Sequence, residues 1–235
     1  MGWERCWMGW GERLAAYLTI AMSLLPPNLP VFVPEDRYSI AAYLAIEAAT
    51  GKRYEYHDGL LVSVEAMAGG SPSHALIGGH LIREVGVAII DAERRGAALR
   101  GQRCDSYSSD LRIAVDGGKR YLYADAVVVC GEPAYDEAIP TAVVNPLVVF
   151  EVLSPSSEGY DRGPKFDFYG SLDALREYVL VDQARRRVEV STRASAVEPW
   201  HVTVVTDPTG AVALPSLGVR LPMAGIYRNW RAPEG

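Results

Sequence analysis

Two short runs of apolar, largely β-branched residues constrain the fold of this 235-residue chain most strongly. Residues 125–130 read DAVVVC and residues 146–153 read PLVVFEVL, and turn-forming residues lie between them. Continuous apolar runs of this length are typical of strands that are buried on both faces of a sheet. The sequence therefore predicts a domain built around at least two central strands.

Segments on both sides of these runs predict helices and further strands. Apolar residues at helical spacing predict a helix over residues 36–49 and a second one from Ser71 to about Arg95. Asp58-Gly59 between two alternating segments predicts a hairpin. The remaining expectations are strands over residues 97–104, 111–115, 177–182 and 187–192, a polar loop over 154–163, a helix over 164–175 and a hairpin around 207–210. This order predicts a mixed α/β domain with one central sheet covered by helices.

The ends of the chain are expected to lie outside this domain. We interpret residues 1–35 as an N-terminal extension with a proline-rich linker, for which Met22 is the expected natural start. Residues 36–225 form the predicted single domain, and residues 226–235 form a tail. The apolar run over residues 14–25 is about 12 residues long, whereas a membrane-spanning helix needs about 20. We therefore expect no membrane association.

Charge and cysteine content narrow the functional classes. The net charge is -6, from 23 Lys and Arg against 29 Asp and Glu, which argues against a protein that coats nucleic acid through bulk charge. It does not exclude an enzyme that acts on nucleic acid through metal-binding carboxylates. Cys6, Cys104 and Cys130 are odd in number and show no CxxC spacing, so we expect neither a disulfide framework nor a zinc site. A reducing, cytoplasmic compartment is the simplest expectation.

Two acidic residues interrupt the apolar strands. Asp125 begins the first run, and Glu151 lies inside the second, on the same strand face as Val149 and Leu153. A buried carboxylate is costly unless it is paired or binds a cation. A divalent cation such as Mg²⁺, held by both carboxylates, would satisfy them, since hard cations favour oxygen ligands. The alternative is that a backbone N–H or an arginine satisfies each acid.

Lys165 is a third candidate, in the first turn of the helix predicted to begin at Pro164. A lysine beside helix N-terminal amides is suited to bind phosphate. Tyr169 lies four residues later on the same helix face. The alternative is a solvated lysine on a surface helix. His74 and His80 lack the i, i+4 spacing of a helical zinc pair, so we interpret them as surface or core histidines.

Six segments together resemble one family. YEYHDGLL, SSDLRI, YADAVVVC, VFEVLSPSS, YDRGPKFDFY and REYVLVD are similar to the Uma-type family of restriction-endonuclease-like proteins, within the PD-(D/E)XK nuclease superfamily. The resemblance extends from about residue 36 to residue 192. It implies an α/β, restriction-endonuclease-like core, in which a central mixed β-sheet is flanked by α-helices and two central strands carry a metal site.

The resemblance also implies roles for individual residues. Asp125 matches the acid of the PD element and Glu151 matches the acid of the (D/E)XK element. In our own hypothesis both acids bind the metal, with a backbone carbonyl near Val152 as a further ligand. The lysine of that element would fall at Leu153, and the family carries it instead on the following helix, where Lys165 stands.

Two further polar positions and two departures accompany this match. Glu55 and Asp110 match polar positions of the family, although Glu55 is equally interpretable as a hairpin residue and Asp110 as a strand cap. Ala124 replaces the proline that usually precedes the first acid. Pro164 precedes Lys165 and could change the direction in which the lysine points.

These observations lead to one hypothesis and two alternatives. We expect a phosphodiesterase that depends on Mg²⁺, with Mn²⁺ as a substitute, and that acts as an endonuclease on DNA. The first alternative is a catalytically inactive nuclease-fold module that binds nucleic acid or a protein partner. The second is an α/β domain in which internal arginines engage Asp125 and Glu151. The sequence leaves open DNA against RNA, sequence specificity, and whether a homodimer forms.

Overall fold

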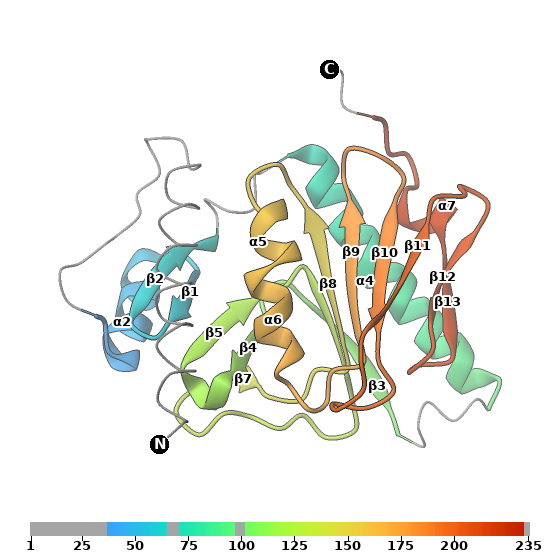
Figure 1. The fold of residues 1–235 in the computed structure, drawn as a ribbon. Coiled ribbons are helices and arrows are strands. Elements are labelled where there is room, and N and C mark those ends of the chain that lie inside the picture. Colours follow the sequence, from blue (N-terminus) through green and yellow to red (C-terminus); the bar gives the residue numbers. More distant parts are fainter. Residues whose placement is uncertain (1–36, 65–70, 97–101, 233–235) are drawn as a thin grey trace, which may run out of the picture. The chain divides into compact units, whose positions relative to one another are not determined.

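The computed structural model describes residues 37–64, 71–96 and 102–232. The predicted N-terminal extension, including Met22, lies outside the described residues. Two sheets and one separate hairpin form the framework, and helices pack against them (Figure 1). No helix in the described ranges is long and apolar enough to cross a membrane.

The six-stranded sheet contains both apolar runs as neighbouring strands. Its order is β11-β10-β9-β8-β6-β3, and only β8 and β9 are parallel. The strands are β3 (Cys104–Ser108), β6 (Ala126–Cys130), β8 (Val148–Leu153), β9 (Glu177–Asp182), β10 (Val188–Thr192) and β11 (His201–Val205). All six residues of β8 are buried, as expected for a central strand.

The five-stranded sheet, in the order β2-β1-β5-β4-β7, was not predicted as a separate sheet. The predicted hairpin at Asp58-Gly59 is confirmed, since both residues have positive φ and join β1 to β2. Tyr43 packs on this sheet against the rings of Tyr56 and Tyr121. The elements are α2 (Ile40–Thr50), β1 (Tyr54–His57), β2 (Leu60–Ser63), β4 (Arg112–Val115), the 3₁₀ turn η1 (Asp116–Gly118), β5 (Arg120–Tyr123) and β7 (Ala142–Val143).

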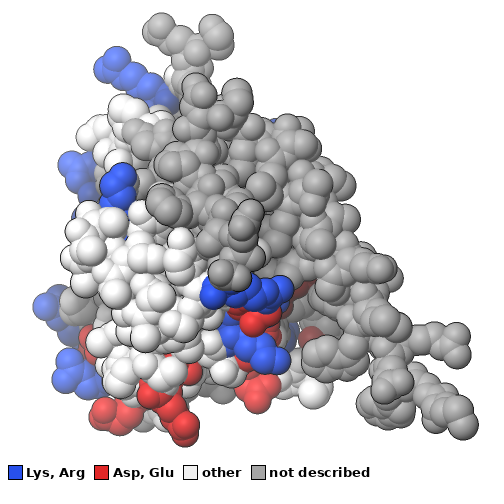
Figure 2. All heavy atoms as spheres, turned by 90° about the vertical axis from the view of Figure 1, so that its left-hand side faces the viewer, with Lys and Arg blue, Asp and Glu red and all other residues white. Residues whose placement is uncertain are grey.

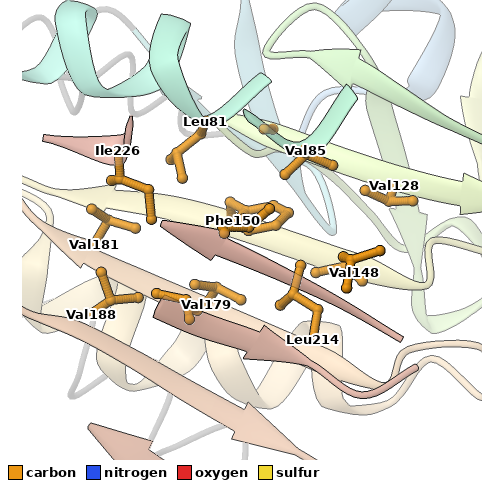
Figure 3. Close-up of a cluster of buried hydrophobic side chains, with 14 of the residues drawn as sticks. Leu81, Val85, Val128, Val148, Phe150, Val179, Val181, Val188, Leu214 and Ile226 are labelled. Atoms are coloured by element: carbon orange, nitrogen blue, oxygen red, sulfur yellow. The ribbon is translucent and has the colours of Figure 1, made fainter. Parts of the chain in front are cut away.

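Helices cover both faces of the six-stranded sheet (Figure 1). On one face, α4 (Pro72–Arg94) packs beside α7 (Met223–Ile226) and the hairpin of β12 (Ala211–Leu214) and β13 (Val219–Pro222). Figure 3 shows the core on that face, where side chains of α4 meet Val148 and Phe150 of β8. On the other face lie α5 (Glu158–Arg162) and α6 (Pro164–Gly170), against the opposite side of β8.

Several predicted boundaries were wrong. The strand predicted over residues 97–104 instead covers Cys104–Ser108, because the polar residues of Cys104–Ser108 pair with β6. Residues 97–101 lie outside the described ranges. The predicted loop over residues 154–163 contains α5, and α6 ends at Gly170 rather than near residue 175. The C-terminal hairpin joins β12 to β13, whereas β11 pairs with β10. Ile226 and Tyr227, assigned to the tail, are buried in the core.

The cysteine interpretation also needs correction. A disulfide links Cys104 on β3 to Cys130 on β6, where the two residues are direct partners in the antiparallel strand pair. Sequence spacing did not reveal this pairing, because it depends on the register of two strands 26 residues apart. The bond fastens the edge strand to the strand that follows Asp125.

Candidate functional site

A pocket of about 270 Å³ collects four of the five predicted site side chains. It lies where the two sheets approach each other, beside the first turns of α4 and the two helices α5 and α6. Its titratable lining residues are Arg53, Glu55, His74, Tyr123, Asp125, Glu151, Tyr160, Asp161 and Lys165.

Asp125 lies at the junction between β5 and β6. Its backbone N–H donates to the carbonyl of Phe150 at 3.1 Å, and its Oδ2 accepts from the N–H of Val152 at 2.7 Å. These bonds fix the carboxylate against β8, next to the strand position that carries Glu151. Its side chain is 20% exposed and can therefore be reached from the pocket.

Glu151 is buried in the middle of β8, on the face that Val149 and Leu153 share. Burial raises the pKa of Glu151 well above its usual range, against the opposing effect of Lys165. Its Oε1 has no hydrogen-bond partner in the described structure, although the Lys165 ammonium lies 2.9 Å away. The partner of this buried oxygen is therefore the Lys165 ammonium, and a divalent cation would share the carboxylate with it.

Lys165 is buried and points into the carboxylate cluster. Its Nζ donates to the carbonyl of Tyr123 at 2.8 Å and lies 3.3 Å from Glu55 Oε1. Burial opposes its charged form, but Glu151 and the other carboxylates raise the pKa of Lys165 well above its usual range. The interpretation as a solvated surface lysine was therefore wrong. Pro164 begins α6 and leaves the lysine directed at Glu151.

Glu55 extends from β1 into the pocket and is fully buried. Its Oε2 accepts from the hydroxyl of Tyr160 at 2.7 Å and lies 3.3 Å from His57 Nε2. Burial acts to raise the pKa of Glu55, but Lys165 and His57 lower it to about 2. Glu55 on β1 is thus a charged partner of Lys165 on α6 at neutral pH.

The sequence analysis missed Asp161. It lies on α5 with its side chain buried, 3.8 Å from Lys165 Nζ. Burial raises the pKa of Asp161 to about 6, despite the opposing effect of Lys165 and of a hydrogen bond with Ser157. Its i, i+4 spacing from Lys165 was visible in the sequence, but residues 154–163 were interpreted as a loop.

His74 is the second missed residue. Ser71 caps α4 by accepting the N–H of His74 at 3.0 Å, which places the histidine in the first helical turn. His74 Nε2 lies 3.4 Å from Asp125 Oδ2. Burial opposes protonation, but the contact with Asp125 raises the pKa of His74. The helix start at Ser71 could have indicated the position of His74, but the sequence analysis considered only its spacing from His80. In the structure His80 is a core histidine bonded to the backbone carbonyl of Ile226.

Asp110 does not join the pocket lining. Its side chain is 82% exposed and accepts from Arg53 Nη1 at 3.0 Å. It also accepts a hydrogen bond from Ser108 at the end of β3. The structure thus separates Asp110 from the carboxylate cluster and pairs it with a pocket-lining arginine.

The described residues fit a divalent cation bound by few protein ligands. Four carboxylates, Glu55, Asp125, Glu151 and Asp161, line the pocket beside one buried ammonium, and one oxygen of Glu151 has no hydrogen bond. In the described ranges, no three His, Cys, Asp or Glu side chains form a preassembled metal site. Mg²⁺ typically uses only one or two carboxylates together with water and substrate phosphate, so Asp125 and Glu151 suffice in number.

Arginines do not satisfy these two acids. Within the described structure, the contacts of Asp125 come from Val152 and His74, and the cation beside Glu151 is Lys165. The alternative in which internal arginines engage both acids is therefore wrong.

Comparisons with known proteins agree with this architecture. The family model described as "Uma2: Putative restriction endonuclease" matches residues 40–224. The uncharacterized protein sll1609 of Synechocystis is 32% identical over 149 residues, 63% of this chain and 77% of that protein. The uncharacterized protein slr1290 of the same organism is 32% identical over 196 residues, 83% of this chain and 94% of that protein.

A solved structure shares the fold. The crystal structure of a putative nuclease belonging to DUF820, from Anabaena variabilis, matches with a TM-score of 0.57 and 15% identity. The match covers 76% of this chain and 91% of that chain. The expected fold class, a nuclease-like mixed α/β core with helices on the sheet, is therefore confirmed.

Proposed function

The chain belongs to the Uma2 family of putative restriction endonucleases, and from this premise we propose that it is a Mg²⁺-dependent phosphodiesterase, an endonuclease that hydrolyses DNA. Mn²⁺ is the expected substitute for Mg²⁺. The family supports a nuclease-like function in general terms. The metal, the DNA substrate and the roles of single residues are our proposal.

One observation carries the proposal. Glu151 is a buried carboxylate whose Oε1 lacks a hydrogen bond, and Asp125 lies against the same strand in the same pocket. Glu151 pairs with Lys165, but burial still raises its pKa well above its usual range, so this carboxylate is unfavourable for stability alone. Its presence on an otherwise apolar strand is explained if a divalent cation binds between the two acids.

Each residue then has a physical task. Asp125, Glu151 and the backbone carbonyl of Val152 would hold the cation, which would lower the pKa of an attacking water and polarise the phosphate. Lys165, 2.9 Å from Glu151 Oε1, would direct that carboxylate and stabilise negative charge on the phosphate. Glu55 fixes Lys165 from the second sheet.

Cleavage of supercoiled plasmid tests this proposal. The wild type should nick or linearise the plasmid with Mg²⁺ or Mn²⁺ and not with EDTA, and Asp125→Ala and Glu151→Ala should abolish cleavage. Asp91→Ala, an exposed acid on α4, is the matched control and should cleave normally. Metal-dependent cleavage retained by either site variant would remove that residue from the mechanism.

A second candidate function is an inactive nuclease-fold module that binds nucleic acid or a protein partner. It is favoured by one feature, the Lys165 ammonium that lies against Glu151 and already offsets part of its charge. Binding of duplex DNA without cleavage under any divalent cation would support this candidate.

Assembly and location stay predictions. A homodimer would allow both strands of a duplex to be cut, and size-exclusion chromatography with light scattering tests it. We also predict a cytoplasmic location. The Cys104–Cys130 disulfide argues against a reducing compartment, so fractionation of cells is the appropriate test.

A further inference from the structure

We propose that Arg53 binds a backbone phosphate of the nucleic acid at the mouth of the pocket, and that Asp110 positions it. The chemical identity of this ligand, a phosphodiester, rests on the proposed function. The contact itself is argued from the geometry and charge of Arg53. It assigns a substrate-binding role to one residue and a positioning role to a residue that lies outside the metal site.

The guanidinium of Arg53 is held by one of its ends. Arg53 directly precedes β1 and lines the same pocket as Asp125 and Glu151. Its Nη1 donates to the carbonyl of Ser109 and to Asp110 Oδ1. In the described structure its Nε and Nη2 make no hydrogen bond, and the side chain is 37% exposed. Two nitrogens, which carry three N–H groups, therefore remain to donate to an incoming anion.

An aromatic ring also contacts this guanidinium. The Arg53 Cζ lies 5.6 Å from the centroid of the Tyr123 ring, within the range of a cation–π contact. The carbonyl of Tyr123 accepts from Lys165, so the same residue contacts both cations of the pocket. A guanidinium fixed in this way loses little conformational entropy when it binds phosphate through two parallel N–H bonds.

The charge of the pocket favours a further cation that can contact the phosphodiester. Its four carboxylates repel a phosphodiester, and the ammonium of Lys165 is buried among three of them. Of the two lysine and arginine side chains that line the pocket, only Arg53 has N–H groups without a partner in the described structure. On the face shown in Figure 2, the described Lys and Arg side chains form no single extended basic surface.

Asp110 orients Arg53 through Nη1 and leaves Nε and Nη2 of Arg53 available to bind phosphate. It uses Oδ1 for Arg53 Nη1, whereas Oδ2 accepts from Ser108. Because its side chain is 82% exposed, water screens its charge and leaves Arg53 attractive to phosphate. A positioning role for Asp110 explains why the sequence resemblance includes this acid although its side chain does not line the pocket.

Duplex binding at several salt concentrations tests the proposal. A fluorescein-labelled 20-bp DNA duplex is titrated with protein in Ca²⁺, and anisotropy gives the affinity of the wild type, Arg53→Gln, Arg53→Lys and Asp110→Asn. Arg94→Gln is the charge-matched control, because Arg94 is 77% exposed and lies 20 residues along α4 from His74, about 30 Å away. Circular dichroism confirms that each variant is folded.

The expected result separates charge from geometry. Arg53→Gln should bind the duplex about tenfold more weakly than the wild type. Raising the salt from about 50 to about 200 mM should weaken its binding by a factor about 3.5 times smaller than for the wild type, because one phosphate contact is missing. Arg53→Lys should keep the wild-type salt dependence but bind several-fold more weakly, because the two-pronged donor is lost. Asp110→Asn should weaken binding two- to threefold, and Arg94→Gln should leave it unchanged.

The outcomes also separate this inference from the proposed function. Unchanged binding by Arg53→Gln, or equal losses with Arg94→Gln, overturns the Arg53 contact even if the wild type cleaves plasmid. Loss of binding in Arg53→Gln while no divalent cation gives cleavage supports the contact and refutes the nuclease. A wild type that binds no duplex overturns the inference outright.

Discussion

Asp161→Asn should stabilise the metal-free protein. Burial raises the pKa of Asp161 from its ordinary 3.8 to about 6. Between these two values the folded state keeps a proton that the unfolded state releases, so stability falls as the pH rises through this interval. Above pH 6 this shift of roughly 2 units corresponds to a loss of about 3 kcal/mol from the free energy of unfolding. Asparagine is neutral and has a similar shape, so the substitution should remove this loss. At pH 5 the expected gain in the free energy of unfolding is about 1.6 kcal/mol.

Urea unfolding in EDTA measures this effect. The free energy of unfolding of Asp161→Asn should exceed that of the wild type by about 3 kcal/mol at pH 8 and by about half of that at pH 5. Asp91→Asn, on the exposed face of α4, is the control and should differ from the wild type by less than about 0.5 kcal/mol at both values. If Asp161→Asn is less stable than the wild type at pH 8, the reasoning about its burial is refuted.

Three further changes test other parts of the structure. Lys165→Met should lower the free energy of unfolding at pH 8 by about 3–5 kcal/mol, because it leaves buried carboxylates without their cation; a loss below about 1 kcal/mol in urea unfolding would contradict the ion cluster. His74→Gln should weaken Mn²⁺ binding at least about tenfold in calorimetry, since His74 supports Asp125; unchanged affinity would exclude this support. Replacing Cys104 and Cys130 by serine should lower the free energy of unfolding in urea by about 3.5 kcal/mol, as expected for a disulfide that closes a loop of 26 residues. If the variant and the wild type are equally stable under non-reducing conditions, the disulfide does not form.

The apolar strands and the first hairpin could be predicted because their signals are local. β6 and β8 are continuous apolar runs, and Asp58-Gly59 has the positive φ values that such a turn needs. The strand β3 could not be predicted in the same way. Its sequence CDSYS is polar, and only pairing with the apolar β6 makes it a strand.

The candidate site shows the same division. The face of β8 on which Glu151 lies follows from the two-residue period of a strand, and the structure places it there. The contact between Glu55 on β1 and Lys165 on α6 joins residues 110 positions apart in the sequence, so no local pattern contains it. His74 and Asp161 were missed because each reaches the pocket through the position of its whole helix.

Calorimetric titration of Mn²⁺ and Mg²⁺ tests the central claim, that Asp125 and Glu151 form a divalent metal site. The account predicts binding to the wild type, no binding to Glu151→Gln or Asp125→Asn, and normal binding to Asp91→Asn. The neutral amides keep the shape of the carboxylates, so loss of binding reports lost charge rather than a damaged fold. Equal binding by the wild type and both site variants, or no binding by the wild type with duplex DNA present, would contradict the account.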